Sequence, residues 1–221
     1  MDFPDLESDL SGVCDLINIL REPDGCPWDK KQTPNSLTKH LVEECYELVE
    51  AIENNDLENI EEEIGDVLLN LAYQIIFLKE KKQSGEEIII KKLYSKIHTR
   101  HPHVFSDLQL KNSDEVEKNW ENIKKVNNND NLSAIPKYLP SLNLAEKIQK
   151  KYMAMNSNLD ISDAIKNLQK VLMTDDEFDS DMLGSILFDL TNIARLKNID
   201  PEKSLRIYIK KYIKDSNEKQ A

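Results

Sequence analysis

Two consecutive long segments of this chain place apolar residues three or four positions apart, and this spacing limits the possible folds more than any other feature. Side chains at that spacing lie on one face of an α-helix, whereas a strand alternates with a period of two. The first segment covers residues 36–54, with Ser36 as its predicted N-cap, and the second covers residues 57–82. The two apolar stripes are Leu37, Leu41, Cys45, Leu48 and Ile52, then Ile60, Ile64, Val67, Leu68, Leu71, Ile75 and Leu78. We expect two antiparallel helices packed through these stripes.

The rest of the chain has the same helical character. Further helices are predicted at residues 6–21, 86–100, 114–126, 142–156, 160–173, 180–197 and 201–214. Residues 22–36, which are dense in Pro, Gly, Asp and Asn, predict an ordered loop. No run of residues alternates convincingly, and Ile88–Ile90 is the first candidate for a strand. The predicted fold class is therefore all-α.

The composition of the chain limits which kinds of molecule it is expected to bind. The formal net charge of −12 disfavours nucleic acid, because phosphate backbones are bound by clustered Lys and Arg. A nucleotide remains compatible with this charge, since a divalent cation can lie between acidic side chains and phosphates. No stretch approaches the roughly 20 apolar residues of a membrane span. The acidic start lacks the pattern of a signal peptide, and three cysteines do not suggest a disulfide framework, so a cytoplasmic location is predicted.

Four carboxylates accompany the two long helices. Glu44 and Glu47 are one turn apart on the first helix, and Glu63 and Asp66 repeat this spacing on the second. If the helices pack through their stripes, these side chains meet at a common rim. Such a rim suits Mg²⁺, which prefers oxygen ligands. One acidic pair alone is more often a solvated helix face, so the metal hypothesis depends on having both pairs.

Two further residues of the second helix support a site at this rim. Gly65 lies between the acidic residues, although glycine inside a helix costs about 1 kcal/mol relative to alanine. We therefore expect another backbone or a ligand to come close to it. Asn70 continues the line of the carboxylates and is a candidate substrate contact.

Basic and aromatic residues supply candidate substrate contacts. Lys96 and Arg100 are four positions apart and share a helix face, which suits phosphate binding or an ordinary solvated basic patch. Trp28 in the predicted loop can stack on a base or cover core residues, and Lys30 follows it. The nearby pair His101 and His103 is interpreted as part of a structural turn and not as a metal pair.

Taken together, these segments resemble the MazG family of nucleoside triphosphate pyrophosphohydrolases. The matching pieces are LREPDGCPWDKKQT (20–33), LVEECYELVEAI (41–52), EEIGDVLLNLAYQI (62–75), KIHTRHPHVF (96–105) and NWENIKK (119–125). The resemblance implies an all-α fold of helix bundles in a homodimer. It also implies hydrolysis of a nucleoside triphosphate to the monophosphate and diphosphate, with Mg²⁺ as cofactor and Mn²⁺ as an acceptable substitute.

The resemblance assigns roles to particular residues. It places the metal ligands at Glu44, Glu47, Glu63 and Asp66, with Glu43 beside them in support. Catalytic and phosphate-binding roles fall on Lys96 and Arg100, and the general base is either Glu44 or Glu47.

The C-terminal part echoes the second long helix. Residues 183–194 (LGSILFDLTNIA) match residues 64–75 (IGDVLLNLAYQI), but Met182 and Ser185 stand where Glu63 and Asp66 would be. The chain is thus predicted to hold a catalytic module at 1–126, a linker at 127–141, and a degenerate, structural module at 142–221 that resembles the family's second module.

Three functions remain open from the sequence. The first is a pyrophosphohydrolase that removes non-canonical or excess nucleotides. The second is an enzyme of the same kind with one dedicated nucleotide substrate. The third is a non-catalytic, dimeric regulatory or interaction module, which the losses in the second module favour and the intact first module opposes.

Overall fold

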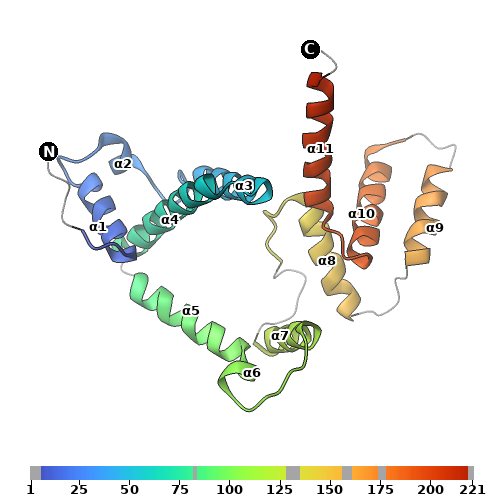
Figure 1. Ribbon diagram of the computed structural model, residues 1–221, viewed down its shortest axis with the longest axis horizontal. Helices are drawn as coiled ribbons and strands as arrows, with labels where there is room; N and C mark the ends of the chain where they lie inside the picture. The colour runs from blue at the N-terminus through green and yellow to red at the C-terminus, as the bar shows by residue number, and fades with distance from the viewer. Residues whose placement is uncertain (1–5, 82–83, 128–134, 156–160, 174–177, 219–221) are drawn as a thin grey trace. The chain divides into compact units, whose positions relative to one another are not determined.

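The structure is a computed structural model that describes residues 6–81, 84–127, 135–155, 161–173 and 178–218 (Figure 1). Every regular element in these ranges is an α-helix, which confirms the all-α fold. The helices are α1 (Leu10–Arg21), α2 (Pro27–Lys31), α3 (Thr38–Asn54), α4 (Leu57–Glu80), α5 (Glu86–Arg100), α6 (Pro102–Phe105), α7 (Ser113–Asn127), α8 (Ser141–Met155), α9 (Ile161–Leu172), α10 (Ser180–Leu196) and α11 (Pro201–Glu218). The candidate strand Ile88–Ile90 is part of α5.

The contacts divide the chain into two compact units, Met1–Trp120 and Glu121–Ala221, and α7 spans this division. Most of the predicted linker at 127–141 falls on residues 128–134, which lie outside the described residues. Among the described residues, no helix is both long and apolar enough to cross a membrane.

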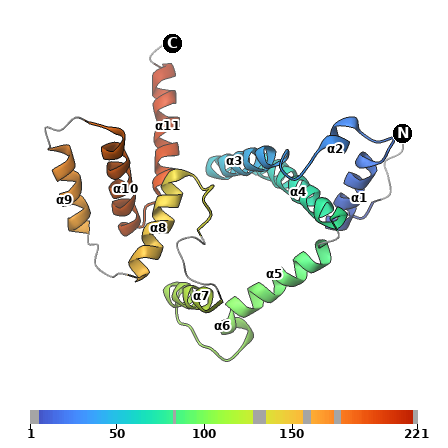
Figure 2. The same cartoon turned by 180° about the vertical axis from the view of Figure 1, so that it is seen from behind.

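The first unit is organised around the pair α3 and α4, which pack side by side (Figures 1 and 2). Asn55 ends α3 in the left-handed conformation, and its N–H bonds back to the carbonyls of α3. Asp56 then caps α4, because its side chain accepts a hydrogen bond from the backbone N–H of Asn59. This two-residue turn places the two helices in antiparallel orientation and so brings their acidic pairs to the same region.

The buried core of this unit lies at the C-terminal half of α4. There α1 packs across α4, and the cluster contains Cys14, Ile17, Leu37, Ala72, Tyr73, Ile75, Ile76 and Phe77. Cys14 and Ile17 are fully buried. The core therefore holds one end of α4 and leaves the acidic end free of α1.

The segment 22–36, which was predicted as a loop, contains the short helix α2. Asp29 is buried, and its carboxylate accepts a hydrogen bond from the Tyr73 hydroxyl of α4. Arg21 donates from Nη1 to the carbonyls of Asp29 (2.8 Å) and Gln32 (3.3 Å) and pairs through Nη2 with Glu80 at 2.9 Å. These contacts fasten α2 to α1 and α4.

The predicted N-cap at Ser36 is wrong. Thr38 is the first residue of α3, and Leu37 stands at the N-cap position without a side-chain bond. The Ser36 hydroxyl is engaged in the preceding turn, where it accepts from the Thr33 N–H and donates to Gln32. The turn thus uses the hydroxyl that the helix would have used.

The apolar stripes are only partly buried in the described chain. Ile75 is buried as expected, but Ile52, Ile64 and Leu71 are about half exposed (52%, 52% and 46%), and Cys45 is exposed as well. The helices α3 and α4 pack together as predicted, but at the acidic end of the pair their stripes are not fully covered. That end presents an apolar face to its surroundings.

After α4 the first unit continues as α5, which leaves the C-terminal end of α4 at an angle and carries α6 at its far end (Figures 1 and 2). Its first turn is anchored by an ion pair of 2.6 Å between Lys79 and Glu86 and by packing of Ile89 against the core. No residue of α5 is buried.

In the second unit α10 packs against both α8 and α9, and α11 contacts α8 and α10. Its buried positions include Ala164, Leu168, Thr191 and Asn192, and the Gln149 side chain donates to the Phe188 carbonyl at 2.7 Å.

Candidate metal site

Three of the four predicted carboxylates meet in space. Glu44 of α3 and Glu63 and Asp66 of α4 each offer one carboxylate oxygen, and these atoms lie within 4.8 Å of one another. All three side chains are half-buried. The i, i+3 spacing on α4 and the antiparallel turn at Asn55 and Asp56 together produce this arrangement.

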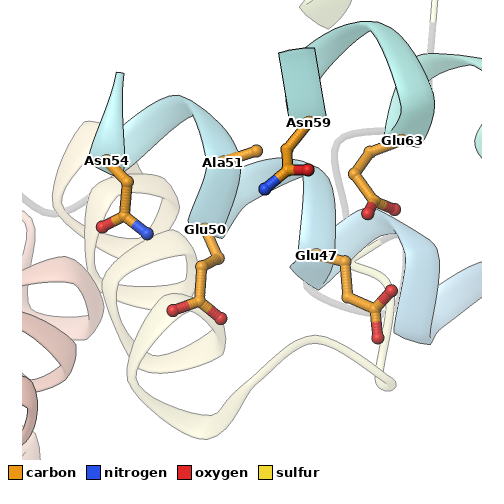
Figure 3. A pocket seen from close by; sticks show the side chains of 6 residues that line it. All are labelled: Glu47, Glu50, Ala51, Asn54, Asn59 and Glu63. Carbon is orange, nitrogen blue, oxygen red and sulfur yellow. The ribbon is translucent and has the colours of Figure 1, made fainter. Parts of the chain in front are cut away.

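Glu47 stands beside this group and not within it. It is exposed and, with Glu63, lines a neighbouring pocket of about 330 Å³ whose other walls are Glu50, Ala51, Asn54 and Asn59 (Figure 3). Figure 3 shows the Glu47 and Glu63 side chains reaching the same region from the two helices. The pocket thus lies next to the carboxylate group, at the end of the α3–α4 pair where Asn55 and Asp56 form the turn.

The carboxylates raise one another's pKa values. Burial raises the pKa of the Glu44 carboxyl above its ordinary value, and the charges of Glu47 and Asp66 raise it further. Burial also raises the pKa of Glu63, with Glu47 and Glu44 adding to the effect. The group therefore carries negative charges that the folded chain holds close together at an energetic cost.

A hard divalent cation fits these residues. Neighbouring ligand oxygens around Mg²⁺ lie roughly 3 Å apart and opposite ones roughly 4 Å apart, so small side-chain rotations would bring three oxygens from 4.8 Å into that range. Glu63 Oε2 is inaccessible and has no hydrogen-bond partner among the described residues, which is the condition expected of a ligand atom. Oxygen donors of this kind suit Mg²⁺ or Mn²⁺.

The residues predicted to support the carboxylates have other contacts. Glu43 lies on α3 next to Glu44 and pairs with Lys39 at 3.2 Å and His40 at 3.4 Å. Asn70 is buried and donates to the Asp66 carbonyl at 3.0 Å, so its side chain lies one turn behind the site. The expectation that another group comes close to Gly65 is not met by the described chain, where an added Cβ would meet nothing within 4 Å.

The predicted contact residues of the loop that precedes α3, Trp28 and Lys30, lie near the N-terminal end of α3. Trp28 is 53% exposed, and its ring meets the His40 ring edge-on with centroids 6.2 Å apart. Lys30 donates from Nζ to the Pro23 carbonyl at 2.6 Å, which fixes it within the loop. His40, which was not among the predicted site residues, stands one turn before Glu44 on the same helix and lowers the pKa of that carboxyl.

Lys96 and Arg100 lie on α5, away from the carboxylates of their own chain. Lys96 is exposed and Arg100 half-buried, and among the described residues neither forms an ion pair. The structure brings together Glu44, Glu63 and Asp66, with Glu47 adjacent, and does not bring the two cations to them.

In the second unit the equivalent positions lack acids. Met182 lies in the first turn of α10, and Ser185 follows it on an exposed position. Within the described residues, the only group of three potential ligands is the one on α3 and α4.

Comparison with known proteins now defines the class. Residues 32–105, which span α3, α4 and α5, match the family model described as the MazG nucleotide pyrophosphohydrolase domain. The chain is 33% identical over 210 residues to the nucleoside triphosphate pyrophosphohydrolase/pyrophosphatase MazG of Thermotoga maritima, an alignment that covers 90% of this chain and 80% of that protein. The chain belongs to the MazG family.

Two other relatives extend the comparison. The uncharacterized protein YabN of Bacillus subtilis is 38% identical over 214 residues, which are 90% of this chain and 44% of YabN, so this chain spans less than half of that relative. The nucleoside triphosphate pyrophosphohydrolase of Escherichia coli is 30% identical over 198 residues, which are 81% of this chain and 75% of that protein.

Proposed function

We propose that this protein is a Mg²⁺-dependent nucleoside triphosphate pyrophosphohydrolase, which converts a nucleoside triphosphate and water to the monophosphate and diphosphate. The observation that carries the proposal is the meeting of Glu44, Glu63 and Asp66 within 4.8 Å inside the segment that matches the family. The names of the relatives from T. maritima and E. coli support the reaction.

In this proposal Glu44, Glu63 and Asp66 hold the metal. A bound Mg²⁺ would neutralise phosphate charge and lower the pKa of a coordinated water. Glu47 is the better candidate for the general base, because it stands outside the ligand group and is near enough to raise the pKa of both Glu44 and Glu63. It would accept a proton from water as the water oxygen bonds to the α-phosphorus and the diphosphate leaves with the bridging oxygen.

The remaining predicted residues act on the substrate. Lys96 and Arg100 would bind the phosphates, since Arg can contact two oxygens and Lys adds a point charge. Trp28 offers an exposed ring face near the N-terminal end of α3, where a base could stack, and Lys30 supports its loop. Glu43 and Asn70 would steady the neighbouring ligands through their contacts with His40 and with the Asp66 backbone.

We also propose a division of labour along the chain. The N-terminal module at 1–126 would carry the one catalytic site, and the C-terminal module at 142–221 would be structural, because Met182 and Ser185 replace its acids. A homodimer is expected, since α3 and α4 expose several residues of their apolar stripes, among them Ile52, Ile64 and Leu71. The proposed role is removal of non-canonical or excess nucleotides in the cytoplasm.

The test is diphosphate release from a panel of standard, deoxy- and damaged nucleoside triphosphates with Mg²⁺, with Mn²⁺ and with a chelator. We expect release with either metal and none with the chelator. Glu63→Gln should abolish release, while Glu61→Gln, which makes the same change at an exposed position of α4, should not. If the wild-type protein releases no diphosphate from any nucleotide, the proposal fails, and a steep preference for one nucleotide would indicate a dedicated enzyme.

A further inference from the structure

The face of α3 that carries the metal-site carboxylate continues toward the N-terminal end of the helix with His40. His40 stands four residues before Glu44, so it lies on the same face, about 6 Å further along the helix axis. The side chain is half-buried. In the proposed reaction the imidazole takes no part in metal binding or in proton transfer, and it is therefore available for another contact with the substrate.

Glu43 determines which nitrogen of His40 is available to a ligand. The Nδ1 atom of His40 lies 3.4 Å from Oε2 of Glu43, while the other carboxylate oxygen of Glu43 pairs with Lys39 at 3.2 Å. A carboxylate beside Nδ1 favours the tautomer that carries its proton on that atom. The Nε2 atom of the neutral ring then has a lone pair and accepts a hydrogen bond. The His40 side chain is 46% exposed, so it is open to a bound molecule.

The exposed ring of Trp28 stands next to His40 on a loop whose backbone is held in place. The two rings meet edge-on, with centroids 6.2 Å apart. The Trp28 carbonyl accepts a hydrogen bond from Gln32 Nε2 at 3.0 Å. The next residue, Asp29, is buried, and its carboxylate accepts a hydrogen bond from the Tyr73 hydroxyl. An aromatic ring that is 53% exposed on such a backbone is already in place for stacking, so little entropy is lost in ordering it.

The order of these groups matches the order of the parts of a nucleotide. In the proposed function the metal held by the carboxylates lies against the α-phosphate, and the base stacks on Trp28. The sugar joins these two parts, and His40 stands between them, one turn from Glu44 and in ring contact with Trp28. The sugar 3′-hydroxyl is on the side of the ring toward the 5′-phosphate, whereas the 2′-hydroxyl is next to the base. A hydroxyl at that place is the donor that the Nε2 lone pair requires.

We propose that His40, oriented by Glu43, is a specificity-determining residue whose Nε2 atom accepts a hydrogen bond from the sugar 3′-hydroxyl of the nucleotide substrate. The inference rests on the proposed function and adds to it a sugar subsite between the metal and Trp28. The contact strengthens substrate binding and discriminates against nucleotides that lack this hydroxyl. The discrimination should be about five- to tenfold in kcat/KM, which corresponds to one neutral hydrogen bond.

Substrates and variants that each lack one partner of this hydrogen bond test the inference. The substrates are the ribo, 2′-deoxy and 3′-deoxy forms of ATP, GTP, CTP and UTP, and diphosphate release by the full chain with Mg²⁺ gives kcat and KM. His40→Phe keeps a ring beside Trp28 but has no nitrogen. For the preferred base, the wild type should use the ribo form about five- to tenfold better than the 3′-deoxy form. His40→Phe should lose this preference through a higher KM for substrates with the 3′-hydroxyl, with kcat nearly unchanged.

Two further variants separate the hydrogen bond from packing. His40→Gln places an amide oxygen near the position of Nε2, so it should recover part of the preference for the 3′-hydroxyl. His98→Phe makes the aromatic replacement at an exposed histidine of α5, on the helix face opposite to Lys96 and Arg100, and should change neither constant. A readout without turnover is calorimetry of the four nucleoside monophosphates and their 3′-deoxy forms with Mg²⁺, which the wild type should distinguish and His40→Phe should not. Circular dichroism checks that every variant is folded.

The outcomes are separable. If His40→Phe raises KM equally for ribo and 3′-deoxy substrates, His40 acts on the base or on the loop, and the inference is overturned. A wild type that does not distinguish these two forms, or a His40→Phe protein that loses a preference for the 2′-hydroxyl instead, would overturn it too. A wild type that releases no diphosphate from any nucleotide would reject the proposed function, and the monophosphate comparison would then still decide whether His40 binds the 3′-hydroxyl.

Discussion

Replacing Glu44 with glutamine should stabilise the metal-free protein and remove most of the stabilisation that we expect from bound Mg²⁺. One carboxylate oxygen of Glu44 lies within 4.8 Å of a carboxylate oxygen of Glu63 and of one of Asp66. Two unit charges at that distance repel by about 1 kcal/mol in a water-like dielectric and by several times more in a buried site. Because these side chains are half-buried and screened, we expect a gain of about 1–2 kcal/mol in the free energy of unfolding.

The pH dependence of the free energy of unfolding of the metal-free protein follows from the raised pKa values of Glu44 and Glu63. A raised carboxyl pKa means that the folded, metal-free chain binds protons more readily than the unfolded chain. Its free energy of unfolding is therefore highest at low pH with respect to these groups. It falls as pH rises from the unfolded value of about 4.3 through the higher folded pKa. Glu44→Gln should flatten this fall.

Bound Mg²⁺ would reverse the effect of Glu44 on the stability of the wild-type protein. A ligand at 100 times its Kd stabilises the folded state by about 2.7 kcal/mol, and Glu44→Gln should lose most of that gain because one ligand is absent. For a chain of this size, each kcal/mol moves Tm by about 2–4 °C. The assay is urea and thermal unfolding of both proteins at neutral pH, once with chelator and once with Mg²⁺.

Glu61→Gln is the matched control, since it removes the same charge from an exposed position on α4. It should change neither the metal-free stability nor the Mg²⁺ response. A Glu44→Gln protein that is less stable than the wild type in chelator, or that keeps the full Mg²⁺ gain, would refute the reasoning about this site.

Three further predictions concern the rest of the first unit. Tyr73→Phe leaves the buried Asp29 carboxylate without its hydroxyl donor, so urea unfolding should show a loss of about 1–3 kcal/mol. Gly65→Ala should stabilise the isolated, metal-free chain by about 1 kcal/mol, because the added Cβ meets nothing within 4 Å, and urea unfolding at low protein concentration checks this. The Cys14 thiol is buried and burial raises its pKa, so at mildly alkaline pH a thiol reagent should label the exposed Cys45 first and reach Cys14 upon unfolding.

Each of these has a control in the same chain. Tyr94 is 67% exposed, so Tyr94→Phe should leave stability unchanged, and an equal loss in both tyrosine variants would argue against the buried hydrogen bond. Gly184 is equally open and should respond to alanine as Gly65 does. Rapid labelling of Cys14 in the folded protein would contradict its burial.

The sequence predicted well what depends on local periodicity. The carboxylates at Glu44, Glu63 and Asp66 were predictable because helical spacing sets their faces and a short turn sets the helix orientation. Helical spacing likewise predicted that Lys96 and Arg100 share one face of α5, but their phosphate-binding role stays a prediction, because their position relative to the carboxylates depends on where α5 packs and no local pattern states that. The helical character of Ile88–Ile90 likewise follows from its neighbours and not from its own strand propensity.

What the sequence did not reveal depends on distant contacts. Asp29 and Tyr73 are 44 positions apart, so neither the burial of Asp29 nor the short helix α2 has a local signal. Ser36 has the right residue type for an N-cap, yet the turn with Thr33 competes for its hydroxyl. Ile64 belongs to the apolar stripe but remains exposed in one chain, because periodicity shows which face is apolar and not what covers it.

Side-chain contacts hold the loop that precedes α3 in place, and this affects how substrate can enter and leave. Arg21 joins the loop to α4 through Glu80, the Asp29 side chain joins it again through Tyr73, and the Thr33–Ser36 turn closes its end. A segment tied to α1 and α4 through Arg21 and Tyr73, and closed on itself by its own turn, is held against opening on each turnover. Admission of a nucleotide and release of diphosphate would then be gated from the opposite side, by the loosely anchored α5. In that case the rate of opening would be sensitive to solvent viscosity and to changes at the Lys79–Glu86 pair, and insensitive to tightening of the loop.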